Sequence, residues 1–183
     1  MNHFVAVIAS SERYAHAEGP TWNASSQRSG EKPDQAGRAL WVDITNGDVY
    51  QATVAEAGSK TSRSVADHSH RLLNTRLVCH VDGTVGAVLP SAAPTPPGAT
   101  RSNEVSPSLV LAAGTRFVYY GSQSYRMANA AALPGVSADV IRFNDAKVDP
   151  WGQIVAGTMA FDAVPDAGAL YRLTPNGGIT TLL

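Results

Sequence analysis

The sequence has a single cysteine, Cys79, and no run of basic residues. One cysteine excludes an internal disulfide framework and any zinc site built from several cysteines. Lys and Arg total 14 against 15 Asp and Glu, which gives a formal net charge of −1. This balance predicts no nucleic-acid partner and no contact with an anionic membrane surface.

Long hydrophobic runs are absent too, because the longest fall far below the roughly 18 residues that a membrane-spanning helix needs. The first residues carry no basic region, and their apolar part is limited to residues 4–9. We interpret this segment as a short strand and not as a signal peptide, and we predict a cytoplasmic protein. Hydrophobic residues make up 44% of the chain and charged residues 16%, a composition that supplies a core and argues against disorder.

Sixteen glycines and eleven prolines favour strands and turns over long helices. Short apolar or alternating segments recur, and many are bounded by Asn-Gly, Asp-Gly or Gly-Gly, which suit tight hairpins. Asn46-Gly47 and Asn176-Gly177 each stand between two such segments. We therefore predict an all-β antiparallel fold, with strands near residues 4–8, 39–44, 47–52, 77–81, 84–89, 109–113, 115–120, 153–159, 168–173 and 179–183.

Three stretches interrupt this pattern, and one of them, residues 54–76, carries scattered charge and two closely spaced histidines. Residues 23–38 are polar and have no hydrophobic period, whereas residues 90–107 are rich in proline and cannot form a central strand. The strand pattern resumes after each of them. We therefore predict two inserted surface loops within one domain that covers residues 1–183.

Two polar clusters could carry chemistry. The denser one runs from Arg142 to Gly152 (Arg142-Phe143-Asn144-Asp145-Ala146-Lys147-Val148-Asp149-Pro150-Trp151-Gly152), just before the strand predicted at 153–159. From composition alone, a solvated turn with internal ion pairs is one interpretation of it. The other is Glu18-Gly19-Pro20-Thr21-Trp22, where the proline restricts the backbone before it and favours an extended chain. A single glutamate there is most simply a surface residue.

Taken together, these segments resemble the regucalcin/gluconolactonase family, also called the senescence marker protein family. The family pattern Arg-Phe-Asn-Asp-Gly-Lys is matched except at Ala146, where the family has glycine. The order and spacing of the matching pieces follow the family over almost the whole chain. Those pieces are Glu18-Gly19-Pro20-Thr21-Trp22, Leu40-Trp41-Val42-Asp43-Ile44, Val85-Gly86-Ala87-Val88, Leu109-Val110-Leu111-Ala112-Ala113-Gly114, Arg142-Phe143-Asn144-Asp145-Ala146-Lys147-Val148-Asp149-Pro150, Ala156-Gly157-Thr158-Met159 and Gly168-Ala169-Leu170-Tyr171-Arg172-Leu173.

The resemblance implies a six-bladed β-propeller that binds one divalent metal ion, calcium or zinc, and hydrolyses sugar lactones or related cyclic esters. Residue by residue, Glu18 matches a metal ligand of the family. Arg142 and Asn144 match residues that hold the substrate. Asp162, three residues after Met159, falls where the family has an acidic substrate contact. The implied partner is therefore a small-molecule lactone.

The same resemblance implies further ligands: an Asn in a Ser-Asn-Gly-Leu stretch, and an Asp in a Pro-Asp-Gly stretch that also serves as general base. Neither stretch occurs in the sequence, so we predict no catalytic residue within it and expect impaired hydrolysis. Propeller repeats of about 40–50 residues indicate that the chain covers three to four blades. We interpret it as an N-terminal fragment, a frameshifted product or a short form. The alternative function is a non-catalytic propeller segment or a calcium-binding module.

Several remaining features have simpler interpretations. Open blade edges predict self-association, because propellers protect their edges by closing. His68 and His70 are interpreted as a surface pair, and Cys79 as a small buried hydrophobic residue. Asp43 and Asp149 are predicted to form hydrogen bonds in turns or between strands.

Overall fold

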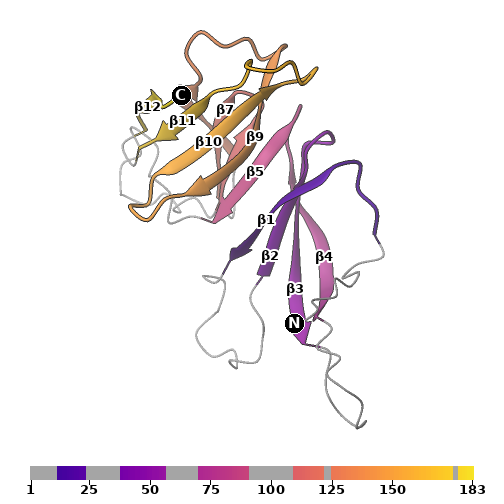
Figure 1. The fold of residues 1–183 in the computed structure, drawn as a ribbon. Helices are drawn as coiled ribbons and strands as arrows, with labels where there is room; N and C mark the ends of the chain where they lie inside the picture. The colour runs from indigo at the N-terminus through magenta and orange to yellow at the C-terminus, as the bar shows by residue number, and fades with distance from the viewer. Residues whose placement is uncertain (1–11, 24–37, 57–69, 91–108, 122–124, 175–176) are drawn as a thin grey trace, which may run out of the picture.

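The structure, a computed structural model, describes residues 12–23, 38–56, 70–90, 109–121, 125–174 and 177–183 (Figure 1). All regular structure in these ranges is β-strand, and no helix in them could cross a membrane. The strands are β1 (Ala17–Asn23), β2 (Arg38–Asp43), β3 (Asp48–Glu56), β4 (His70–His80), β5 (Val85–Pro90), β6 (Leu109–Ala113), β7 (Arg116–Tyr120), β8 (Tyr125–Ala132), β9 (Ile141–Val148), β10 (Ile154–Ala160), β11 (Leu170–Leu173) and β12 (Ile179–Thr181).

These strands form three antiparallel sheets of four strands each, and in each sheet the strands follow one another in chain order. The hairpin between β2 and β3 turns at Asn46-Gly47, as the sequence predicts. Gly47 has a φ of 70°, and a Cβ atom there would lie 2.1 Å from the carbonyl oxygen of Val81. Glycine is therefore required at this turn for both its backbone angle and the space it leaves.

The first strands of the three sheets pack in sequence, with β5 in contact with β1 on one side and β9 on the other (Figure 1). A recurring backbone hydrogen bond joins each sheet to the next. The amide of Val85 donates to the carbonyl of Ile44 (3.2 Å), and the amide of Phe143 donates to the carbonyl of Gly114 (2.7 Å). Both bonds run from the β5 or β9 strand back to the β2–β3 or β6–β7 turn of the preceding sheet. The sheets are thus linked by backbone as well as by side chains.

Two hydrophobic clusters fill the spaces between the sheets, so the β5–β8 sheet contributes to both. Residues of β6 and β7 alternate between the clusters, because successive side chains of a strand point to opposite faces. One cluster holds Leu40, Val42, Ile44, Val49, Val81, Val85, Val88, Leu109, Leu111, Ala113 and Val118. The other holds Ala87, Leu89, Val110, Ala112, Phe117, Tyr119, Leu133, Phe143, Ala146, Ile154, Ala156, Tyr171 and Leu173.

The all-β prediction is confirmed, and nine of the ten predicted strands fall on strands of the structure. The tenth, at residues 4–8, lies outside the described residues. Three strands were not predicted from the sequence: β1, β8 and β9. The turn interpretation of the Arg142 cluster is wrong for residues 142–148, which belong to β9, and only residues 149–152 form the turn that follows it.

The two predicted loops lie mostly outside the described residues, at 24–37 and 91–108. Their predicted ends belong to strands, because Asn23 pairs with Arg38 across β1 and β2, and Pro90 pairs with Leu109 across β5 and β6. The interpretation of His68 and His70 also concerns side chains outside the described part. The number of six blades stays a prediction.

Candidate functional site

Two glycines bring the backbones of β1, β5 and β9 close together. A Cβ atom at Gly19 would lie 3.5 Å from the carbonyl oxygen of Gly86. A Cβ atom at Gly86 would lie 2.5 Å from the carbonyl oxygen of Phe143 and 3.0 Å from the amide nitrogen of Asn144. Glu18 of β1 and Asn144 of β9 therefore come from strands that both contact Gly86. We call β1, β5 and β9 the inner strands, because β5 packs against both β1 and β9. Four of their residues, Glu18, Gly86, Arg142 and Asn144, together with Met159 of the neighbouring strand β10, are called the inner-strand site.

The strand that carries Glu18 is irregular at this point. The pairing of β1 with β2 shifts register between Glu18 and Thr21, and Gly19 has a φ of 57°. Such a shift is a β-bulge, which re-aims the side chains beside it. The extended backbone predicted before Pro20 is therefore interrupted at Gly19, a residue that adopts positive φ without steric cost.

Arg142 is a buried cation without a carboxylate partner among the described residues. Arg142 is 8% exposed to solvent. One terminal nitrogen, Nη1, donates to the carbonyl of Phe143 (3.0 Å) and to Oδ1 of Asn144 (3.2 Å), and Nη2 lies 3.3 Å from Sδ of Met159. Burial lowers the pKa of the guanidinium from its usual value, yet arginine stays protonated at neutral pH. A buried charge held by neutral acceptors is poorly compensated.

The contact with Arg142 also fixes the amide of Asn144. A guanidinium can only donate hydrogen bonds, so the amide oxygen must face it. The Nδ2 group of Asn144 is then left to donate elsewhere, and Asn144 itself is exposed. Arg142 and Asn144 together present N–H groups that could donate hydrogen bonds to a carbonyl or hydroxyl oxygen of a ligand.

Glu18 carries an exposed carboxylate. Its Oε1 lies 4.0 Å from Nε2 of His16, and its Oε2 is 3.4 Å from the amide nitrogen of Gly19. The side chains of both residues are about half exposed, so this ion pair is weak. The carboxylate of Glu18 is thus available to a cation.

Asp43 fastens the segment that leads into β1. It is buried, and its two carboxylate oxygens accept hydrogen bonds from the amides of Ala15 (2.8 Å) and His16 (2.9 Å). It also accepts from Nδ2 of Asn46 in the β2–β3 turn (3.1 Å). The predicted hydrogen-bonding role of Asp43 is confirmed, and Asp43 positions the residues just before Glu18.

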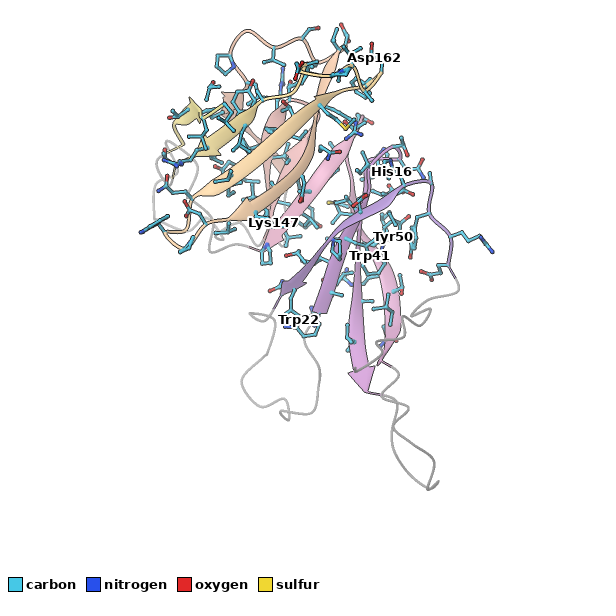
Figure 2. All side chains as sticks on the ribbon, in the orientation of Figure 1. His16, Trp22, Trp41, Tyr50, Lys147 and Asp162 are labelled. Atoms are coloured by element: carbon cyan, nitrogen blue, oxygen red, sulfur yellow. The ribbon has the colours of Figure 1, made fainter. Side chains whose placement is uncertain are left out.

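An aromatic cluster packs against the segment that leads into β1, and no signal in the sequence predicts this cluster. The rings of Trp41 and Tyr50 stack at 5.8 Å, and Tyr14 packs edge-on against both. Figure 2 shows Trp41 and Tyr50 on the first sheet, and His16 just before its strand β1. Burial and the hydrogen bond to the Asp48 carboxylate raise the pKa of Tyr50. Tyr50 therefore stays neutral and serves as a packing residue.

Asp162 lies at one end of the β9–β10 hairpin, away from the end near which Lys147 lies (Figure 2). Its carboxylate accepts a hydrogen bond from the amide of Val164 (3.3 Å) and is exposed. Asp149 closes the opposite turn by accepting from the amides of Trp151 (2.9 Å) and Gln153 (2.8 Å). The turn role predicted for Asp149 is confirmed, whereas the substrate role of Asp162 stays a prediction.

No group of three or more His, Cys, Asp or Glu side chains that could hold a metal ion occurs among the described residues. Glu18 supplies one carboxylate, fewer ligands than a calcium or a zinc site needs. The described residues therefore do not fit a divalent ion on their own. Cys79 is partly buried against the core, and burial raises the pKa of its thiol to about 11. Cys79 packs against the core as predicted, although it is only partly buried.

Residues 16–183 match the family described as the SMP-30/Gluconolactonase/LRE-like region. Regucalcin of Danio rerio is 42% identical over 72 residues, which are 38% of this chain and 24% of that protein. The match thus covers much less than two thirds of the length of this relative.

Two solved structures have a similar fold. A calcium-binding protein, regucalcin, from Agrobacterium tumefaciens aligns with a TM-score of 0.57 and 18% identity, over 93% of this chain and 43% of that one. A luciferin-regenerating enzyme aligns with a TM-score of 0.52 and 18% identity, over 92% of this chain and 45% of that one. The chain therefore spans less than half the length of either structure. The three sheets are those of a β-propeller, and the chain belongs to the SMP-30/gluconolactonase/LRE-like family.

Proposed function

We propose that the inner-strand site binds the carbonyl end of a lactone and belongs to a metal-dependent lactone hydrolase. The observation that carries the proposal is the buried guanidinium of Arg142, which has no carboxylate partner among the described residues. A buried charge needs polar partners, and a bound carbonyl or hydroxyl oxygen would supply them. Membership of a family that includes gluconolactonase supports this choice of ligand.

The chemistry that these residues can perform is orientation and charge stabilisation. Donors from Arg142 and Nδ2 of Asn144 would hold a ring carbonyl or hydroxyl and would stabilise negative charge that develops on the oxygen during attack. Burial strengthens this effect, because a charge acts more strongly where water is excluded. Asp162, in the same proposal, would accept a hydrogen bond from a substrate hydroxyl at Oδ2, while its Oδ1 accepts from the Val164 amide.

We also propose that Glu18 is one ligand of a divalent ion, calcium or zinc, that needs further ligands. Its exposed carboxylate supports this role, and the Agrobacterium tumefaciens structure that resembles the chain is described as a calcium-binding protein. Such an ion would polarise the lactone carbonyl and acidify bound water.

Binding of a lactone analogue tests the proposal. The non-hydrolysable D-glucono-δ-lactam is expected to bind the chain, and Arg142→Ala should weaken binding about ten- to hundredfold, because a hydrogen bond to a charged donor is worth roughly 1.5–3 kcal/mol. The measurement is isothermal titration calorimetry. Arg116 is exposed on β7, so Arg116→Ala is the matched control and should leave binding unchanged. Equal affinities of the wild type and Arg142→Ala would refute the proposed role of Arg142.

Turnover should be absent even where binding occurs. We expect the 183-residue chain to hydrolyse gluconolactone no faster than buffer does, with calcium or zinc present, because calcium takes six to eight oxygen ligands and zinc about four donors. A pH-indicator assay measures this, with chelator as the reference. Metal-dependent hydrolysis that Glu18→Gln abolishes would show that the chain completes its own metal site.

A calcium-binding segment without hydrolysis is the second candidate function. Glu18 favours it, because its carboxylate is exposed and its only ionic contact among the described residues is the weak pair with His16. The two candidates differ in one result: the calcium-binding segment predicts no effect of Arg142→Ala on any ligand.

A further inference from the structure

The β9–β10 hairpin ends in an exposed apolar surface next to the inner-strand site. Val140, just before β9, is 54% exposed, and Phe161, just after β10, is 51% exposed. We call these two residues the apolar lip. They lie side by side, because the amide of Phe161 donates to the carbonyl of Val140 (3.0 Å).

The register of the hairpin places the apolar lip on the same face as Arg142. Met159 pairs with Arg142, and Ala160 pairs with Ile141, in the last two steps of the ladder. Phe161 follows the end of β10, but its hydrogen bond to Val140 continues the ladder by one step, and the alternation of side chains then places Phe161 on the face of Met159. The contact of 3.3 Å between Nη2 of Arg142 and Sδ of Met159 shows that these two side chains share a face as well. The opposite face is buried, since Phe143 and Ala160 belong to the interior.

Polar and apolar groups therefore follow one another across one surface: the Asn144 amide, the Arg142 guanidinium, the Met159 thioether and then the apolar lip. A ligand whose carbonyl reaches Arg142 would extend its far end over Val140 and Phe161. These two side chains offer no hydrogen bond to a ring hydroxyl, whereas an alkyl group there would remove apolar surface from water.

We infer that the site prefers lactones that carry an alkyl substituent over polyhydroxylated sugar lactones. This inference rests on the proposed function, because it assumes that Arg142 binds the carbonyl end of the ligand. Burial of one methylene group favours binding by about fourfold, and a butyl chain that is partly covered by the lip should gain about tenfold.

Two non-hydrolysable probes test the inference on the 183-residue chain: a δ-lactam with a butyl side chain, and D-glucono-δ-lactam. Calorimetric titration should give an affinity about tenfold higher for the butyl lactam. Phe161→Ser should abolish that preference, because it weakens binding of the butyl lactam about tenfold more than binding of D-glucono-δ-lactam. Trp151 is the matched control, because it is an exposed aromatic residue (78%) in the turn at the other end of the same hairpin. Trp151→Ser should change neither affinity.

The outcomes separate the two claims. If Arg142→Ala weakens both lactams but Phe161→Ser affects neither, or weakens both equally, the inference fails and the proposed function stands. The inference also fails if the wild-type chain binds the two lactams equally. If neither lactam binds, or if Arg142→Ala changes nothing, the proposed function fails and the inference fails with it. Both Phe161 and Trp151 are exposed, so neither substitution should unfold the chain.

Discussion

Substitution of Gly86 by alanine is expected to destabilise the fold by about 3 kcal/mol, because overpacking of a close contact typically costs roughly 1–3 kcal/mol and here only backbone could yield. The new Cβ atom would lie 2.5 Å from the carbonyl oxygen of Phe143 and 2.6 Å from its carbonyl carbon. The two strands β5 and β9 would have to move apart to remove this steric clash. That movement would displace Arg142 and Asn144, so binding of D-glucono-δ-lactam should also be lost.

Gly157 provides the matched control for this substitution. It lies in β10, and a Cβ atom there would meet no atom within 4 Å. Gly157→Ala should therefore change stability by no more than about 1 kcal/mol, in either direction. Urea unfolding, followed by circular dichroism, measures both variants. Equal stabilities of Gly86→Ala and Gly157→Ala would mean that β5 and β9 do not touch at Gly86.

Truncation of Phe143 to alanine is the second substitution with a large expected effect, about 3–5 kcal/mol. The side chain is 0% exposed, and its ring lies 4.8 Å from that of Phe117. It links β9 to the β5–β8 sheet, so the cavity would open between two sheets. Because Phe143 stands between Arg142 and Asn144, weaker ligand binding should accompany the loss of stability.

Phe161→Ala is the control for Phe143→Ala, since it removes the same atoms from a half-exposed position of the same hairpin. Its effect on stability should stay within about 0.5 kcal/mol. The two variants are compared by their urea midpoints at equal slope. A loss below about 1 kcal/mol for Phe143→Ala would contradict the burial of this ring between the sheets.

Much of the fold could be predicted because apolar alternation and turn dipeptides act locally. The strands from β5 to β7 and the turn at Asn46-Gly47 follow from these signals. The strand β9 could not be recognised by them, since Arg142, Asn144 and Asp145 look like residues of a solvated turn. In the structure the polar side chains of Arg142 and Asn144 contact each other, and Phe143 faces the core. Polar residues at these positions break the apolar pattern of a strand, so β9 could not be recognised from that pattern.

The residues of the candidate site also fall into two groups: those that could be predicted from the sequence and those that could not. Arg142, Asn144 and Glu18 could be chosen because their motifs resemble those of a family, and the structure brings their strands together around Gly86. The role of Gly86 could not be predicted, because it depends on which backbone lies opposite it in another sheet. The anchoring of residues 15 and 16 by Asp43, and the contact of Met159 with Arg142, depend on register in the same way.

The central claim is that β1, β5 and β9 together form one ligand site. Titration of the ¹⁵N-labelled chain with D-glucono-δ-lactam, followed by amide chemical shifts, tests it most directly. The account predicts that the amides of Gly19, Gly86 and Asn144 shift together and saturate at one ligand concentration. Shifts confined to the ends of β3 and β4, around Asp48 and His80, or no shift in the three inner strands, would contradict it.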